Sequence, residues 1–163
     1  MSRAVCRPFV YKERVSAMEK KKVLFVCIHN SARSQMAEAW MNHLCGERFV
    51  AESAGLDPGT LNPLVVAVMK EVGIDISGKS ARSVFDVCKS GALFSDVITV
   101  CDESAAEACP IFPGPAKHIH MGFTDPSKLE GSEQEKLVQV RVIRDSIRKA
   151  VEAFCQQEQT SGK

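Results

Sequence analysis

The residues best suited to chemistry lie where Cys27 ends an apolar run, with Arg33 following after five intervening residues and Ser34 beside it. A polar loop between a strand and a helix N-terminus directs backbone N–H groups inward and adds the positive end of the helix dipole. A helix N-terminus and a neighbouring arginine also favour the thiolate form of a cysteine. An arginine can grip two oxygens of a tetrahedral anion at once. The pattern therefore predicts a loop that holds an oxyanion against a nucleophilic sulfur.

The alternative is that Cys27 is a buried cysteine at a strand end and Arg33 an ordinary surface charge, since cysteine often behaves as a small hydrophobic residue. The surroundings favour the chemical interpretation. An apolar strand precedes the loop, and an amphipathic helical segment follows it. A short motif gains meaning when its structural context is also present.

The elements that must position these residues alternate between strand and helix patterns. The apolar residues 23–26 predict a buried strand inside a parallel sheet. Further strands are expected at 48–54, 95–100 and 117–121, and helices at 34–44, 63–72, 83–90 and 132–157. This order predicts an α/β protein, a single-domain three-layer sandwich with a central parallel four-stranded sheet and helices on both faces. The domain is expected to span residues 21–157, with residues 1–20 a flexible N-terminal extension and 102–115 a long loop.

Ligands of open α/β sheets bind beyond the carboxyl ends of the strands. Cys27, Cys101 and the loop that carries Asp125 all follow such ends. A carboxyl group near a bound oxyanion can protonate a departing oxygen, so Asp125 is a candidate general acid. As a bare dipeptide, Asp125-Pro126 is also a common turn.

Cys101 and Cys109 are separated by seven residues, a loop short enough to close into a disulfide if it moves. They can equally be a buried strand-end residue and an incidental loop thiol. A zinc site with His118 and His120 is disfavoured because the spacing lacks a Cys-x2-Cys pair, so no metal site is predicted.

The composition limits the partners. The chain has 163 residues, a formal charge of +1 and 45% hydrophobic residues, so it carries no general basic field for nucleic acid or membrane. None of its apolar runs approaches the length of a membrane span. Seven cysteines form an odd count, and the N-terminal segment lacks a signal-like apolar region, which predicts a cytoplasmic protein with reactive thiols rather than a disulfide scaffold. We also expect a monomer.

Taken together, several motifs of the sequence resemble those of a known family. Residues 27–40 (CIHNSARSQMAEAW), 52–55 (ESAG), 70–77 (KEVGIDIS), 99–101 (TVC), 109–110 (CP) and 122–126 (GFTDP) are similar to those of the thioredoxin-coupled arsenate reductases. These enzymes share the fold of the low-molecular-weight protein tyrosine phosphatases. The resemblance covers about residues 21–154, and the combination of motifs is specific.

The resemblance implies a mechanism by thiol–disulfide exchange. Cys27 would attack arsenate, and Asp125 would protonate the leaving oxygen. Cys101 would attack the Cys27 sulfur and release arsenite, and Cys109 would then attack Cys101. The resulting Cys101–Cys109 disulfide would be reduced by thioredoxin, and no cofactor would be required. The anion would be bound by the loop residues Ile28, His29, Asn30, Ser31, Ala32, Arg33 and Ser34.

Within that loop, the resemblance implies that Asn30 braces the backbone and that Ser34 donates a hydrogen bond to the Cys27 sulfur. Two positions depart from family patterns. Ala32 stands where some relatives carry a cysteine, which leaves Cys101 as the expected partner of Cys27. His29 replaces a glycine found in many members, and its contact with either the anion or the rim stays open.

The family's potassium site is matched at Asn30, Glu38 and Ser53. An acidic residue expected near the start of the third helix is replaced by Arg82, whose own charge could fill that site. Potassium is therefore not expected to be required.

Two other functions compete. The same loop could serve a tyrosine phosphatase hydrolysing phosphate monoesters, and weak phosphatase activity is expected in any case. However, Ser127 and Lys128 stand where such phosphatases place aromatic residues, and Cys101 and Cys109 would have no role. The other competing function is a non-enzymatic thiol redox sensor. The presence of both Arg33 and Asp125 counts against it, because a sensor does not need a general acid. The reductant could be thioredoxin or glutathione with glutaredoxin, and the seven-residue spacing favours thioredoxin.

Overall fold

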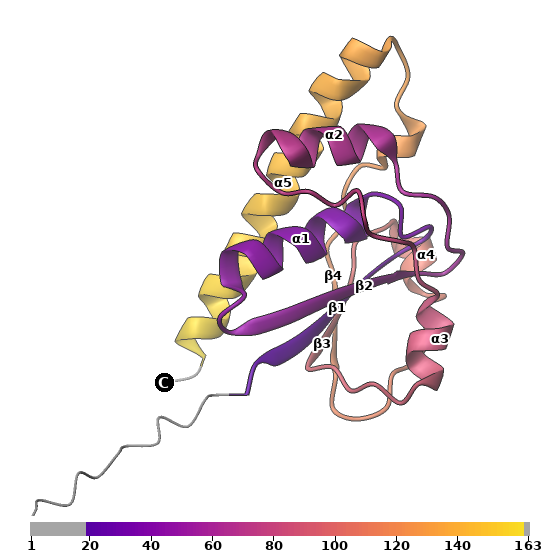
Figure 1. Cartoon of the computed structure of the whole chain (residues 1–163). Helices are drawn as coiled ribbons and strands as arrows, with labels where there is room; N and C mark the ends of the chain where they lie inside the picture. The colour runs from indigo at the N-terminus through magenta and orange to yellow at the C-terminus, as the bar shows by residue number, and fades with distance from the viewer. Residues whose placement is uncertain (1–18, 162–163) are drawn as a thin grey trace, which may run out of the picture.

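A four-stranded sheet with all strands parallel runs through the centre of the molecule, in the order β2-β1-β3-β4 (Figure 1). The computed structural model describes residues 19–161, so most of the predicted N-terminal extension lies outside the described residues. The strands are β1 (Lys21–Cys27), β2 (Phe49–Gly55), β3 (Asp96–Thr99) and β4 (Lys117–His120). The predicted parallel four-stranded sheet is confirmed, and its first strand lies in the interior of the sheet.

Helices cover both faces of the sheet, as predicted. They are α1 (Arg33–Cys45), α2 (Pro63–Glu71), α3 (Val84–Lys89), α4 (Glu103–Ala106) and α5 (Glu133–Thr160), with a 3-10 turn η1 (Pro126–Lys128). One expectation is corrected, because the loop predicted at 102–115 contains α4. Asp102 precedes this helix in the extended conformation of a cap residue, and the following residues favour helix. One turn is too short for hydrophobic periodicity to reveal it.

The alternation of side chains along β1 divides the interior into two apolar clusters. Phe25 belongs to the first cluster, which packs beneath α1, α2 and α5, and Leu24 belongs to the second, on the side of α3 (Figure 1). Cys27 and Cys101 lie in the first cluster. The second cluster is instead packed against Cys88 and Cys109, so the two faces of the sheet surround different cysteines.

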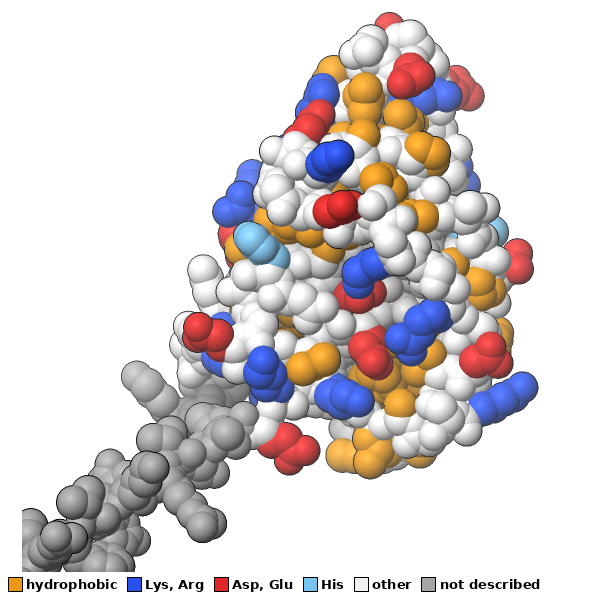
Figure 2. Space-filling view, in the orientation of Figure 1, with side chains coloured by type: hydrophobic (Ala, Val, Ile, Leu, Met, Phe, Trp, Pro, Cys, Tyr) orange, Lys and Arg blue, Asp and Glu red, His pale blue; other side chains and the backbone are white. Residues whose placement is uncertain are grey.

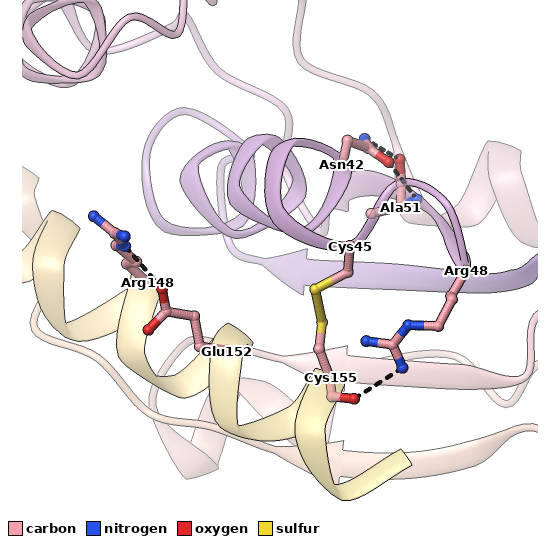
Figure 3. Close-up of a disulfide and its surroundings, with 7 residues drawn as sticks. All are labelled: Asn42, Cys45, Arg48, Ala51, Arg148, Glu152 and Cys155. Atoms are coloured by element: carbon pink, nitrogen blue, oxygen red, sulfur yellow. Dashed lines mark hydrogen bonds and ion pairs between the residues drawn. A yellow bond between two sulfur atoms is a disulfide. The ribbon is translucent and has the colours of Figure 1, made fainter. Parts of the chain in front are cut away.

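A disulfide between Cys45 and Cys155 joins the last residue of α1 to α5, with the two Cα atoms 6.6 Å apart (Figure 3). Both residues are buried, and Arg48 Nη1 donates to the Cys155 carbonyl at 3.0 Å. The sequence, which predicts reactive thiols rather than a disulfide scaffold, gives no sign of this one disulfide. The partners are 110 residues apart, so only the packing of α1 against α5 reveals them.

The surface in view mixes charges of both signs. Figure 2 shows Lys and Arg side chains interspersed with Asp and Glu, without a continuous field of one sign on that face. Among residues 19–161, no helix is both long and apolar enough to cross a membrane. Location in the cytoplasm stays a prediction.

Candidate active site

The loop between β1 and α1 wraps around the Cys27 sulfur. The Asn30 backbone N–H donates to Cys27 Sγ at 3.1 Å, and Ser34 Oγ lies 2.8 Å from the same sulfur. The hydrogen bond expected between Ser34 and Cys27 is thus present.

The loop directs its carbonyl groups away from the sulfur and leaves its N–H groups facing inward. The carbonyls of Cys27, Ile28, His29 and Ser31 accept hydrogen bonds of 2.7–3.1 Å from backbone N–H groups of residues 56–62. Ala32 precedes α1 without any capping side chain. Because the first N–H groups of a helix have no partner within it, they remain available to an anion. This arrangement of residues 28–34 around Cys27, which we call the anion cradle, has the geometry to hold an anion.

Asn30 holds this loop in shape from beneath. It is fully buried and has a φ of 51°, a left-handed conformation that a non-glycine residue adopts rarely. Its Nδ2 donates to Ser34 Oγ at 2.8 Å, and its Oδ1 accepts from the Arg82 backbone N–H at 2.9 Å. Gly55 permits the close approach, because a Cβ there would lie 2.7 Å from the Asn30 nitrogen.

Gln35 is a supporting residue that the sequence analysis missed. Its Nε2 donates to the Asn30 carbonyl oxygen at 3.1 Å, and its side chain is only 1% exposed. A polar residue at the start of an amphipathic helix gives no sign of burial. Only the fold, which places the chain near Ser80 over this helix, shows it.

Arg33 and Asp125 meet at one side of the cradle. The guanidinium of Arg33 is buried, and its Nη2 lies 3.3 Å from Asp125 Oδ2. Its Nη1 donates to the carbonyl of Phe123 at 3.1 Å, so the loop after β4 fixes its orientation. Sequence order along the sheet predicts this meeting, because both residues follow carboxyl ends of strands.

The Asp125 carboxylate is strongly hydrogen-bonded. Its Oδ1 accepts from the Ser127 backbone N–H at 2.9 Å and from the Ser127 hydroxyl at 2.8 Å. Burial alone would raise the pKa of Asp125, but these bonds and the charges of Arg33 and Lys128 outweigh it and lower the pKa. The free protein therefore holds Asp125 as a carboxylate beside Arg33.

His29 lies at the rim of the cradle. Its Nδ1 is 2.9 Å from the Asp57 carbonyl oxygen, and about half of its side chain is exposed (49%). The imidazole packs toward the turn at residues 57–59, which favours the rim, and a contact of His29 with the anion stays a prediction.

Cys101 lies at the neighbouring strand end. The Val100 backbone N–H donates to the Val26 carbonyl at 2.9 Å, which aligns the end of β3 with the end of β1. Burial raises the pKa of the Cys101 thiol; the Arg33 charge opposes this effect, and a charged Cys27 adds to it. Cys101 is completely buried and lies within electrostatic reach of both active-site residues.

Cys109 is not gathered into the cradle. It follows α4, is half-buried and packs against the second apolar cluster. Burial, followed by the thiolate charges of Cys101 and Cys88, raises the pKa of Cys109 to about 11. The thiolate form of Cys109 is therefore disfavoured in this position.

At the residues matched to the family's potassium site, a lysine side chain already provides a positive charge. The Glu38 carboxylate accepts from the Ser53 hydroxyl and pairs with the ammonium of Lys79. The expectation that Arg82 fills this site is wrong, since its guanidinium lies 3.9 Å from Glu52 instead. Lys79 already neutralises the one carboxylate of the set, so these residues do not fit a potassium ion.

Comparison with known proteins agrees with this geometry. The family model described as low molecular weight phosphotyrosine protein phosphatase matches residues 22–161. The chain therefore belongs to the low molecular weight phosphotyrosine protein phosphatase family.

Within that family it is similar over most of its length to arsenate reductases. It is 39% identical to the arsenate reductase of Bacillus subtilis over 140 residues, which cover 85% of this chain and 98% of the relative. A solved arsenate reductase in the reduced state shares 29% identity with a TM-score of 0.64, covering 84% of this chain and 98% of its own. The thioredoxin-dependent arsenate reductase of Corynebacterium glutamicum shares 26% identity with a TM-score of 0.58, covering 85% and 65%.

Proposed function

We propose that this protein reduces arsenate to arsenite, using Cys27 as the nucleophile and Cys101 as the first resolving thiol. The observation that carries the proposal is a second thiol at the strand end beside the cradle. Hydrolysis of a phosphate ester needs only Cys27, Arg33 and Asp125, whereas reduction also needs a sulfur that can attack Cys27. Cys101 lies within reach of the charges of Cys27 and Arg33.

The first step forms a Cys27–arsenic bond. The backbone N–H groups and Arg33 hold the tetrahedral anion, the Cys27 thiolate attacks arsenic, and one oxygen leaves as water after taking a proton from Asp125. Asp125 is a carboxylate in the free protein because its pKa is lowered. A bound anion shares the Arg33 charge and adds a negative charge beside the carboxyl, which favours the protonated acid.

The second step transfers two electrons to arsenic. The Cys101 thiolate attacks Cys27 Sγ, the sulfur–arsenic bond breaks with its electron pair on arsenic, and arsenite leaves. Cys109 then attacks Cys101 and expels the Cys27 thiolate, leaving a Cys101–Cys109 disulfide. We propose thioredoxin as the dithiol that reduces it. One chain supplies every group up to the Cys101–Cys109 disulfide, so a second copy of the chain or a nucleic acid is not needed.

We also propose that potassium is not required, because the Lys79 ammonium provides the positive charge beside Glu38. Lys79 is followed by Ser80, whose carbonyl accepts from Gln35, and Arg82 reaches Asn30 through its backbone. This lysine thus positions the segment that braces the loop.

A weaker phosphatase activity is expected from the same cradle. Phosphate has the shape and charge of arsenate, so a phosphate ester can form a Cys27–phosphate adduct that water hydrolyses. The residues after Asp125-Pro126 are Ser127 and Lys128, neither of which is aromatic. The aryl group of a substrate therefore finds no aromatic side chain at these positions, and the phosphatase activity should be weak.

The test measures arsenite formation coupled to NADPH oxidation in the presence of thioredoxin and thioredoxin reductase. Hydrolysis of an aryl phosphate is measured on the same preparation. Turnover of arsenate is expected, with a lower kcat/KM for the aryl phosphate, and Cys27→Ser should abolish both. Rapid ester hydrolysis without arsenite formation would assign the protein to phosphatases instead. Replacing thioredoxin by glutathione with glutaredoxin in the assay tests the alternative reductant.

A further inference from the structure

Cys88 is a free thiol that the proposed function does not use. It lies on α3 and is half-buried, and its Sγ lies 3.8 Å from the carbonyl oxygen of Ile111. Cys109 Sγ lies 3.7 Å from the carbonyl oxygen of Pro110, the preceding residue. The two sulfurs are therefore directed at adjacent carbonyl groups of one segment.

The same two thiols share one apolar environment. Cys88 and Cys109 both pack against the second apolar cluster, on the α3 side of the sheet, whereas Cys101 is part of the first cluster. Each of Cys88 and Cys101 lies close enough for its charge to raise the pKa of Cys109. In this arrangement Cys88 and Cys109 lie on the same side of the sheet and both sulfurs approach residues 110–111, whereas Cys109 reaches Cys101 only if its segment moves.

We infer that Cys88 is a fourth redox thiol, which takes over the disulfide from Cys101 and carries it onto α3. The inference rests on the proposed function, because it needs the Cys101–Cys109 disulfide as its starting point. It adds one residue and one disulfide to that scheme.

The exchange balances without any external reactant. The Cys88 thiolate attacks Cys109 Sγ, the Cys101–Cys109 bond breaks, and Cys101 leaves as a thiolate that takes up a proton. One disulfide is lost and one is formed, so the protein keeps the same number of electrons. The new Cys88–Cys109 disulfide joins two half-buried sulfurs, whereas Cys101 is completely buried.

A dithiol reductant finds better access at the new position. Two apolar side chains near it are unusually exposed, with Ile111 89% exposed and Phe85 43%. Phe85 lies on α3, and Ile111 follows Cys109 by two residues. Exposed apolar side chains near a reactive disulfide suit the docking of a protein reductant.

The exchange has a stoichiometric consequence. Once the disulfide lies between Cys88 and Cys109, both Cys27 and Cys101 are thiols again. A second arsenate can then be reduced, leaving a Cys27–Cys101 disulfide. Without a reductant, one chain would release about two arsenites through four thiols, whereas three thiols provide for about one.

The experiment counts arsenite released per chain by reduced, desalted protein mixed with excess arsenate and no reductant. The wild type should release about two arsenites, and Cys88→Ser about one, a twofold loss. Cys6→Ser is the matched control, because it removes a thiol of the sequence that the inference does not use, and it should keep the wild-type yield. Cys88→Ala serves as a second variant, and hydrolysis of an aryl phosphate should be unchanged in all of them.

The disulfide itself can be mapped by mass spectrometry. Cleavage after Lys89 and after the acidic residues Asp102, Glu103 and Glu107 separates Cys88, Cys101 and Cys109. A peptide pair linking Cys88 to Cys109 is expected. Equal arsenite yields from wild type and Cys88→Ser, with only Cys101–Cys109 linked, would overturn the inference and leave the proposed function standing. Release of no arsenite at all would overturn both.

Discussion

At the scale of single residues, the reactivity of the site depends on how hydrogen bonds and charges are shared around Cys27. Two donors face its sulfur, and the Arg33 guanidinium stands between the anion cradle and Asp125. The Ser127 hydrogen bonds and the Arg33 charge lower the pKa of Asp125 in the free protein. Under the proposed function, an anion bound at Arg33 would favour the protonated acid, so binding and proton transfer would be linked through this arginine.

Asp125→Asn should separate these two roles. Hydrolysis of an aryl phosphate should fall by about 10²–10³-fold, because the leaving oxygen loses its proton donor. Inhibition by inorganic phosphate should stay as strong or become stronger, since a negative charge beside Arg33 is removed. Steady-state kinetics with phosphate as inhibitor measures both.

The pH dependence follows from the direction of the Asp125 pKa. A carboxyl group with a lowered pKa loses its proton at lower pH, so kcat/KM for the aryl phosphate should rise toward acidic pH in the wild type. The asparagine variant should lack this acid-side dependence. Equal losses of phosphate binding and of rate in the variant would show that Asp125 only positions Arg33.

At the scale of elements, β1, α1 and the segment at residues 79–82 act as one unit. The segment reaches the loop through Arg82 and Asn30, reaches α1 through Lys79 and Glu38, and holds the end of β2 through the Gly55 N–H. The anion cradle is consequently held by residues that are far from it in sequence. We expect a disturbance in that segment to affect loop geometry before it affects the sheet.

Lys79→Met tests this support. The Glu38 side chain is 14% exposed and would lose its partner, so unfolding free energy should fall by about 1–2 kcal/mol, a figure reduced for the partial exposure of Lys79. The variant should regain stability and activity in potassium chloride more than in sodium chloride, whereas the wild type should not distinguish the two salts. Denaturant unfolding and arsenate assays in both salts provide the measurement.

Lys149→Met is the matched control, since Lys149 is an exposed lysine on α5. It should change neither stability nor salt response. A wild type that depends on potassium, or a Lys79→Met variant that is indifferent to it, would contradict the role given to the lysine.

The elements also show what the sequence could predict and where it failed. Alternating apolar runs and amphipathic segments define the parallel sheet, and the order of strands along the chain brings Cys27, Cys101 and Asp125 to one edge. Lys79 escaped prediction because its partner Glu38 lies 41 residues away and nothing local links them. The role of Gln35 was not predicted because burial of a polar side chain leaves no periodic signal in the sequence. Helix α4 was not predicted because a single helical turn is too short to show a periodicity.

At the scale of the whole molecule, the cysteines divide into separate groups. Cys45 and Cys155 join α1 to α5 at a distance from the cradle, and the four free cysteines of the described residues are divided between the two faces of the sheet. The disulfide is structural in this arrangement, because neither of its residues contacts the loop that surrounds Cys27. The redox state of the Cys45–Cys155 disulfide can therefore be independent of the redox state of Cys27 and Cys101.

The double variant Cys45→Ala/Cys155→Ala should test this division. A disulfide that closes a loop of 110 residues restricts the unfolded chain, so its loss should lower the unfolding free energy by about 2–4 kcal/mol. Release of arsenite per chain in the absence of reductant should be unchanged. Denaturant unfolding of the variant, compared with wild type whose Cys45–Cys155 disulfide is intact, measures the effect. Unchanged stability together with lost arsenite release would show that this pair belongs to the redox relay.

The central claim is that a second strand-end thiol turns a phosphatase cradle into a reductase, and Cys101→Ser tests it most directly. Arsenite formation with thioredoxin, thioredoxin reductase and NADPH is measured on the variant beside hydrolysis of an aryl phosphate. The account predicts that multiple turnover of arsenate is abolished while ester hydrolysis persists, because only reduction needs the Cys101 thiol. Equal loss of both activities, or loss of neither, would contradict it.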